Sequence, residues 1–440
     1  MLAEILNLKN QIFRGSLKFN QKGTLMIIEK YSLGIGDRFA HQGKAQLLAF
    51  LNTEKQGVNI TPVWNKSYRE HSIVKTEPAS VRTEADSAVK AMGWSGCYHV
   101  DADHIGLKNV DLFLDSSDFF TLDVADFVGK PAHPSDVIKF VNKYKKYIGS
   151  LAIPGIDEKF NITRKQIEAV AAKSLLAVKE AGKIYRHIEA AKGRDNFITE
   201  VSMDETDLPQ TPVEMFFILA AIADEKIPVQ TIAPKFTGRF NKGVDYVGDV
   251  SKFATEFEQD LAVIAFAIKK FGLPASLKLS VHSGSDKFSL YKHINKAIKK
   301  FDTGLHLKTA GTTWLEELIG LAMAGGDGFA IAKEVYAKAL SRYDELCAPY
   351  ATVIDIDKGR LPTPSTIEKW TGHDFANALR HDQSCSRYNP DLRQMLHVGY
   401  KVAAEMGDRY LDALEKFETI VAQNVTENLY NRHIKPIFID

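Results

Sequence analysis

The sequence predicts an α/β fold, a closed (β/α)8 TIM-type barrel, from two features that run along the chain. Eight short stretches rich in apolar or β-branched residues recur, and segments with helical periodicity separate most of them. Alternation of strand and helix with parallel crossovers favours a closed barrel over an open sheet. The eight expected strands are Tyr31–Gly36, Val58–Trp64, Cys97–Asp103, Phe119–Val124, Phe197–Met203, Val229–Pro234, Leu277–Val281 and Thr303–Leu307.

The segments between and after these strands predict helices. Helical periodicity is clearest in Gly43–Asn52, Val213–Asp224, Asp249–Phe271 and Thr313–Gly325. The long interval between the fourth and fifth strands, about 130–195, predicts a helical insertion beside or over the barrel mouth, and the residues from about 330 to 440 predict a helical C-terminal extension. We therefore interpret residues 1–440 as a single barrel domain with these two additions.

Composition excludes several classes of protein. The 440 residues are 45% hydrophobic and 25% charged, which is typical of a globular chain and not of a disordered or fibrous one. Lys and Arg number 56 against 55 Asp and Glu, so no net basic field attracts nucleic acid or an anionic membrane. The three cysteines lie far apart, which argues against a disulfide framework. These features predict a cytoplasmic protein without nucleic acid or membrane partners, in which the helical tail could support a homo-oligomer.

Histidines at the ends of expected strands suggest a metal site. His104 follows the third strand, His282 follows the seventh, and His306 lies in the eighth. Three imidazoles at one end of a barrel can bind a divalent cation, leave positions open for a substrate and polarise a sugar carbonyl. Each histidine taken alone is more often a hydrogen-bonded structural residue, so the hypothesis depends on their convergence. Imidazoles accept Zn, Mn, Ni and Co, and the sequence does not choose among these metals.

Two of the expected strands carry acids suited to proton transfer. Asp103 ends the third strand, and Glu200 and Asp204 share one face of the fifth. Opposed acids suit a reaction in which a proton leaves one face of a carbon centre and returns to the other. Asp103 is therefore one candidate and Asp204 or Glu200 the other. Alternatively, Glu200 pairs with Lys278 or Lys308 inside the barrel, and Asp204 caps the following helix.

Cations and hydroxyl residues near the strand ends suit an anionic substrate. Arg38 follows the first strand, Lys235 and Lys242 follow the sixth, and Lys308 follows the eighth. Lys242 fits a solvated loop at least as well. The loop Ser283–Ser285 is similar to the phosphate-gripping loops of barrels, and it could equally bind sugar hydroxyls. The candidate substrate-binding residues are Arg38, Lys235, Ser283 and Lys308.

Several motifs resemble the tagaturonate/fructuronate epimerase family, which includes tagatose 4-epimerases. The motifs are His282–Ser289, His306–Thr312, Ser202–Thr206, Gly36–Phe39 and Arg393–Val398. The resemblance runs through nearly the whole chain, and the motif at His282 is its most specific part. It implies a divalent-metal-dependent isomerase of hexuronate catabolism that inverts carbon 4 of a 2-ketohexuronate and so interconverts tagaturonate and fructuronate.

The resemblance also implies roles for individual residues. The three histidines are then the metal ligands, Asp103 accepts a proton, and Asp204 or Glu200 donates one. Asp101, two residues away on the same face, is an alternative to Asp103. Carbon 4 lies one bond too far from a carbon-2 ketone for enolisation to acidify its hydrogen. Retro-aldol cleavage of the 3–4 bond, rotation of the aldehyde fragment and re-addition to its other face give a consistent route.

Two other functions remain open from the sequence. The first is a class II-type metal-dependent aldolase acting on ketose phosphates, which the Ser283–Ser285 loop suggests. The second is a non-catalytic barrel that binds sugars. In every case the expected ligand is a small molecule, either a ketohexuronate or a neutral ketohexose.

Overall fold

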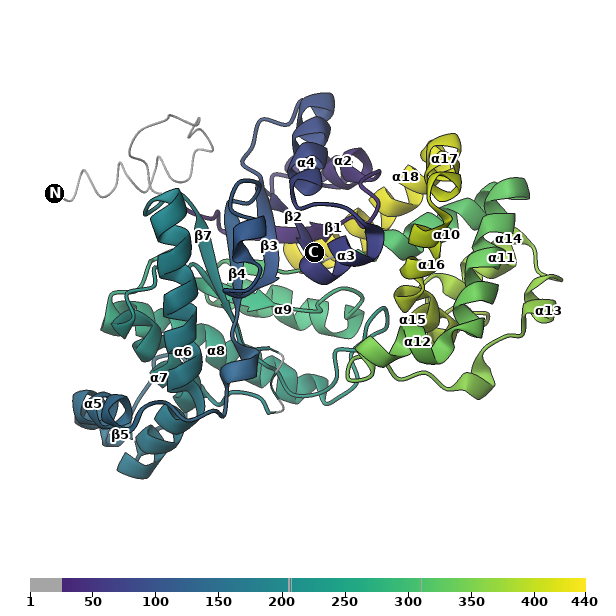
Figure 1. Ribbon diagram of the computed structural model, residues 1–440. Helices are drawn as coiled ribbons and strands as arrows, with labels where there is room; N and C mark the ends of the chain where they lie inside the picture. The colour runs from purple at the N-terminus through teal and green to yellow at the C-terminus, as the bar shows by residue number, and fades with distance from the viewer. Residues whose placement is uncertain (1–25, 205, 207, 310) are drawn as a thin grey trace.

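Eight parallel strands close into a barrel in the spatial order β1-β10-β9-β8-β7-β4-β3-β2. The computed structural model describes residues 26–440 except 205, 207 and 310, and Figure 1 shows the barrel with its surrounding helices. The predicted (β/α)8 barrel is confirmed. Its strands are β1 (Tyr31–Gly36), β2 (Thr61–Ser67), β3 (His99–Ile105), β4 (Phe119–Asp123), β7 (Ile198–Ser202), β8 (Thr231–Ala233), β9 (Lys278–Val281) and β10 (Leu305–Leu307).

The strand β2 lies further along the chain than its apolar run predicts. It begins at Thr61 and continues through Asn65 and Lys66. These two polar residues remain in the strand because their side chains have hydrogen-bond partners: the Asn65 amide donates to the carbonyl of Lys308 at 2.7 Å, and Lys66 Nζ donates to the carbonyl of Arg38, after the neighbouring strand β1, at 3.1 Å. Satisfied polar groups of this kind can be buried at little cost.

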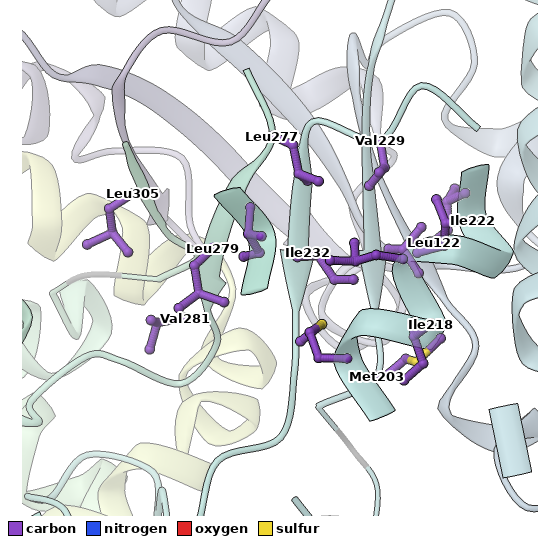
Figure 2. Packing of buried hydrophobic residues seen from close by; sticks show 14 of the residues in the cluster. Leu122, Met203, Ile218, Ile222, Val229, Ile232, Leu277, Leu279, Val281 and Leu305 are labelled. Carbon is purple, nitrogen blue, oxygen red and sulfur yellow. The ribbon is translucent and has the colours of Figure 1, made fainter. Parts of the chain in front are cut away.

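Helices cover the outside of the barrel. Strand residues such as Leu122, Ile232 and Leu279 point outward and are buried in the hydrophobic core, where Figure 2 shows them with Ile218 and Ile222 of α7. This packing is the usual one for buried parallel strands. The elements around the barrel are α2 (Gly43–Glu54), α3 (Tyr68–Val74), α4 (Ala79–Met92), η1 (Val110–Leu112), η2 (Ala125–Phe127), α6 (Arg164–Lys192), α7 (Pro212–Asp224), α8 (Val250–Phe271) and α9 (Phe288–Lys300).

The segment between β4 and β7 holds the predicted helical insertion. Its long helix α6 packs against β4 and α7, as the crossover helix of a barrel does. Helix α5 packs on the outside of α6, and its Tyr144 bonds Asp224 at the end of α7 and contacts Phe271 at the end of α8. The insertion therefore lies beside the barrel, at the end opposite the mouth. Its remaining elements are α5 (Pro134–Tyr144), η3 (Lys145–Tyr147) and the antiparallel hairpin β5 (Gly149–Leu151) and β6 (Phe160–Ile162).

The helical C-terminal extension forms a second hydrophobic cluster beside the barrel. The helix α10 forms where helical periodicity predicts it, but it packs with this cluster. In a regular barrel the helix after the last strand would pack between the first and last helices of the outer ring. Here the last segment of the chain, η6, packs in that position between α2 and α9. The extension comprises α10 (Thr313–Ala324), α11 (Gly326–Ser341), α12 (Tyr343–Cys347), η4 (Ala348–Tyr350), η5 (Lys358–Arg360), α13 (Pro364–Ile367), α14 (Gly372–Leu379), α15 (Pro390–Val398), α16 (Tyr400–Met406), α17 (Asp408–Lys416), α18 (Glu418–Glu427) and the π-helix η6 (Asn428–Ile439).

The described part of the chain contains no helix that is both long enough and apolar enough to cross a membrane.

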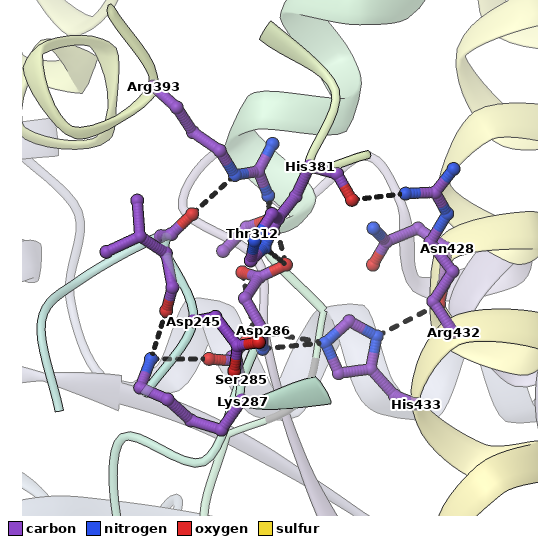
Figure 3. A network of polar contacts seen from close by, with 12 residues as sticks. Asp245, Ser285, Asp286, Lys287, Thr312, His381, Arg393, Asn428, Arg432 and His433 are labelled. Carbon is purple, nitrogen blue, oxygen red and sulfur yellow. Dashed lines mark hydrogen bonds and ion pairs between the residues drawn. The ribbon is translucent and has the colours of Figure 1, made fainter. Parts of the chain in front are cut away.

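A buried ionic network joins the extension to the loop after β9 (Figure 3). Asp286 lies at its centre, completely buried, and Arg393 Nη2 of α15 is 3.2 Å from its Oδ1. Burial opposes the charge of this carboxyl, but Arg393 outweighs burial and holds the pKa of Asp286 well below its usual range. The guanidinium also donates to Thr312 Oγ1 at 2.6 Å and to the carbonyl of Gly243 at 2.6 Å. One arginine therefore fixes the loops after β8, β9 and β10 against the extension.

Replacement of Arg393 by methionine is expected to lower the free energy of unfolding by about 3–5 kcal/mol, because it leaves the Asp286 carboxylate buried without its cation. Urea unfolding measures this change. The double variant Asp286→Asn/Arg393→Met should recover part of the loss. The matched control Arg164→Met removes an exposed pair with Glu168 and should cost less than about 1 kcal/mol. Equal losses for Arg393→Met and Arg164→Met would contradict this assignment.

Candidate active site

Polar and charged side chains line much of the barrel interior. At the lower end, Ile28, Val63, Phe119 and Ile198 form a small apolar cluster. Buried polar and charged side chains lie above this cluster, and they continue to the C-terminal ends of the strands, the mouth of the barrel. The polar residues are Ser32, Asp101, Thr121, Glu200, Ser280, His306 and Lys308. Because charged groups can stay buried only with partners, the charged side chains near the mouth indicate a functional site there.

Three side chains converge at the mouth: His104 of β3, Asp204 after β7 and His282 after β9. One potential ligand atom from each lies within 4.8 Å of those of the other two. His104 reaches this point because the pairing of β3 with β4 shifts register between Ala102 and Ile105 and His104 has a φ of 52°. In a regular strand Asp103 and His104 would face opposite sides, whereas the irregularity brings both toward the mouth.

Carboxylates orient both imidazoles. His104 Nδ1 is 3.3 Å from Asp123 Oδ2, and His282 Nε2 is 2.8 Å from Glu200 Oε1. The other nitrogen of each ring remains available at the place where the three side chains converge. There His282 Nδ1 lies 3.2 Å from Asp204 Oδ1. Histidines that bind metals usually show this arrangement, with one nitrogen on the metal and the other on a carboxylate. Asp123 was missed in the sequence, although it is the last residue of β4.

These residues fit a divalent cation. His282 Nδ1 is buried and faces the Asp204 carboxylate, whose Oδ1 is also a possible ligand atom. Burial disfavours the imidazolium forms, but the nearby carboxylates outweigh it: Asp204 and Glu200 raise the pKa of His282 to about 9, and Asp103 and Asp123 raise that of His104 to about 10. The same negative field attracts a metal ion. Two imidazoles and one carboxylate match the donors that first-row divalent metals prefer.

His306, expected as the third histidine ligand, lies outside this group. It pairs in register with Ser280, two residues before His282, and therefore lies one layer deeper in the barrel. Its Nδ1 bonds Ser32 Oγ at 2.9 Å, and its ring contacts that of Phe119. Burial lowers its pKa to about 3, so the imidazole is neutral. The structure thus brings together two of the three histidines, with Asp204 in the place expected for His306.

Lys308 holds the acids of β3 instead of facing the mouth. Its side chain is 3% exposed, pairs with Asp101 and Thr121, and places Nζ 3.2 Å from Asp103 Oδ1. Burial raises the pKa of Asp101 to about 7, whereas Lys308 and the two mouth histidines outweigh burial at Asp103 and lower its pKa. Asp103 is 17% exposed at the mouth, and Asp101 lies below it. Asp103 therefore lies nearer the mouth than Asp101, and Lys308 contacts both carboxylates.

Glu200 of β7 and Asp204 in the loop after it occupy different depths. Glu200 has no exposed surface and accepts hydrogen bonds from His282 and from Thr121 Oγ1, the latter at 3.2 Å. Asp204 reaches the mouth, is 18% exposed and accepts a bond from Ser202 Oγ at 2.6 Å. It does not cap the next helix, because Thr211 caps α7.

The expected substrate-binding residues have different surroundings. Arg38 Nη2 is 3.2 Å from Glu70 Oε1, and its guanidinium carbon lies 4.5 Å from the centre of the Tyr400 ring. Lys235 is half-buried after β8. Ser283 accepts a bond from Lys242 Nζ at 3.0 Å, and Lys242 is thus not a solvated loop residue.

The loop after β9 is closed against the extension. Ser285 Oγ donates to Asp286 Oδ2 at 3.2 Å and lies 3.3 Å from His433 Nε2 of η6. Its hydroxyl is buried in these contacts. The loop thus lacks the open arrangement that a phosphate-gripping loop needs.

Comparison with known proteins identifies the family. A family model described as tagaturonate epimerase matches residues 10–436. The tagaturonate/fructuronate epimerase of Thermotoga maritima is 26% identical over 420 residues, which make up 92% of this chain and 80% of that protein. Two structures of the fructuronate-tagaturonate epimerase from Cohnella laeviribosi, one with one glycerol and one native, align with TM-scores of 0.77 and 0.75 at 21% identity. Each alignment covers 94% of this chain and 82% of that protein, and these two likenesses establish the shared fold.

The family model spans nearly the entire chain, and the fold agrees with it. The chain belongs to the tagaturonate epimerase family and is an epimerase, an enzyme of the isomerase class.

Proposed function

We propose that this epimerase interconverts tagaturonate and fructuronate by inverting carbon 4, with a divalent cation held by His104, Asp204 and His282. The convergence of these three side chains at the mouth of the barrel carries the proposal. The substrates named for the relatives from Thermotoga maritima and Cohnella laeviribosi support this choice of ketohexuronate. When bound, a divalent cation supplies a Lewis acid that polarises a carbonyl oxygen.

Asp103 is the proton acceptor in this proposal. Lys308 and the two histidines keep its carboxylate ionised, and its Oδ1 lies 3.7 Å from His104 Nε2. It can therefore take the proton of the carbon-4 hydroxyl next to the cation site. The carbon 3–carbon 4 bond then breaks, and its electron pair passes toward the carbonyl at carbon 2, which leaves an aldehyde at carbon 4. Rotation of the aldehyde and re-formation of the bond invert this centre.

The surroundings of Glu200 and Asp204 bear on how the proton returns. Glu200 is buried behind His282, and Asp204 takes part in cation binding, so neither carries a free proton at the mouth. After the bond re-forms, Asp103 returns the proton that it accepted to the carbon-4 oxygen, directly or through exchange with solvent at the partly exposed mouth, and is ionised again for the next turnover. We propose this route in place of the expected donor on the fifth strand, Asp204 or Glu200.

Turnover of tagaturonate in heavy water tests this function and its route. Bond cleavage between carbons 3 and 4 leaves the hydrogen on carbon 4 in place, so the fructuronate formed should carry no deuterium at carbon 4 by mass spectrometry or NMR. Substantial uptake there would reject cleavage in favour of direct proton exchange. Net release of cleavage products, or faster turnover of a ketose phosphate, would instead support an aldolase.

A further inference from the structure

The mouth of the barrel carries a second polar group beside the cation site. Lys242, in the loop after β8, donates from Nζ to Ser283 Oγ at 3.0 Å, and Ser283 directly follows the proposed ligand His282. No Asp or Glu of the described chain lies within 4.0 Å of Lys242 Nζ, whereas Arg239 in the same loop is paired with Asp355 at 2.9 Å. The Lys242 ammonium is therefore placed next to the cation site without a carboxylate partner.

His397, at the end of α15, lies on the other side of this loop. A Cβ atom added to Gly243 would lie 3.5 Å from His397 Nδ1, so the backbone beside Lys242 passes close to the imidazole. The loop is held there because the amide of Lys242 donates to the carbonyl of Val353 at 2.8 Å. Although His397 is buried, its Nδ1 has no hydrogen-bond partner within the described residues.

The electrostatic field around His397 is opposite in sign to that of the cation site. Burial, together with the charges of Arg38, Lys242 and Arg393, holds the pKa of His397 well below its usual range. Carboxylates raise the pKa values of His104 and His282 at the cation site. The charges around the cation site thus favour a cation, whereas those around His397, beside the loop of Lys242, favour an anion.

Lys242 and His397 together form what we call the rim pair. We propose that the rim pair binds the carboxylate of the ketohexuronate and selects it over a neutral ketohexose. This assignment rests on the proposed function and names the residues that determine its substrate class. Arg38 does not take this role, because Glu70 and Tyr400 already engage its guanidinium.

The rim pair suits a carboxylate better than a phosphate. Barrels commonly bind phosphate with backbone N–H groups at the N-terminus of a helix. At α9 the preceding residues Ser285 and Asp286 are buried and bonded to the C-terminal extension, and the Asp286 carboxylate opposes a dianion there. One ammonium and one neutral imidazole match the single charge of a carboxylate.

Affinity and turnover of matched substrates test this assignment. Calorimetry gives the Kd of tagaturonate, and steady-state assays give kcat/KM for tagaturonate and for tagatose, which lacks the carboxylate. In Lys242→Met the ratio of kcat/KM for tagaturonate to that for tagatose should fall about 10- to 100-fold, mainly through KM, because a charge-assisted hydrogen bond is lost. His397→Leu should lower the ratio in the same direction, and His397→Asn, whose amide can replace Nδ1, should restore most of it.

Two lysine variants serve as comparisons. Lys252→Met alters an exposed side chain of α8 and should leave the ratio unchanged. Lys235→Met tests the other lysine after β8. The assignment is overturned if Lys242→Met keeps the wild-type ratio, if Lys235→Met lowers the ratio instead, or if tagatose 6-phosphate depends on Lys242 more strongly than tagaturonate does.

The same measurements separate this assignment from the proposed function. Conversion of tagaturonate that does not depend on Lys242 supports the function and overturns the assignment. Binding of tagaturonate that depends on Lys242, without conversion, supports the assignment and overturns the function. A wild-type protein that neither binds nor converts tagaturonate overturns both.

Discussion

Replacement of His282 by alanine is expected to abolish stoichiometric cation binding and to lower kcat by about 10³-fold, since a catalytic cation contributes several kcal/mol to the transition state. His282 provides a buried nitrogen at the place where the three side chains converge and is oriented there by Glu200. Asp204→Asn should weaken cation binding in the same direction. Elemental analysis of the purified protein and steady-state kinetics with saturating added metal measure the two effects.

His306→Asn is the informative comparison for this experiment. The asparagine can keep the bond to Ser32, and His306 lies one layer below the proposed ligands. The variant should therefore retain its cation. Loss of the cation from folded His306→Asn, or its retention in His282→Ala, would show that the ligand set is not the one proposed here. Circular dichroism establishes that each variant is folded.

Replacement of Asp103 by asparagine should lower kcat by about 10²- to 10⁴-fold while the cation content stays at the wild-type level, because the amide cannot accept a proton. The change is nearly isosteric and preserves contact with Lys308, which lies 3.2 Å from Asp103 Oδ1. Steady-state kinetics with parallel elemental analysis measure both quantities.

Asp101→Asn gives the matched comparison, since Asp101 contacts the same lysine but is buried below the mouth. Its main effect should be a lower free energy of unfolding, because it leaves the buried ammonium of Lys308 with one carboxylate fewer. If Asp101→Asn lowers kcat more than Asp103→Asn does, the roles of the two acids must be exchanged.

The charges around the proposed cation site and those around His397 are opposite in sign. Carboxylates surround His104 and His282, and cations surround His397. A ketohexuronate has oxygen atoms suited to a metal near its carbonyl and a carboxylate at its other end. In the proposed complex each end of the substrate meets the field of opposite sign, which orients the sugar as well as binding it.

The barrel itself could be predicted because strands and helices leave local patterns in the sequence. The helix α10 shows the limit of such patterns. Thr313–Ala324 has helical periodicity and forms a helix, but η6 occupies the place against the barrel between α2 and α9. Which helix packs there depends on contacts between segments more than 100 residues apart, and periodicity carries no information about them.

The proposed cation site was partly predictable for a similar reason. His104 and His282 could be expected as ligands because histidines at strand ends are visible in the sequence, whereas Asp204 was expected only as an acid for proton transfer. The exclusion of His306 could not be predicted, since it depends on the register of β10 against β9. A difference of two residues in that register decides whether a side chain reaches the mouth or lies in the layer below it.

The sequence by itself determined the barrel, the candidate acids and histidines, and the family likeness, because each is carried by residue types and their local spacing. Only the tertiary structure decided the depth of each side chain, the irregularity in β3 that turns Asp103 and His104 to one side, and the approach of His397 to the loop of Lys242. These features depend on strand register and on packing between distant segments, which the three-dimensional fold alone specifies.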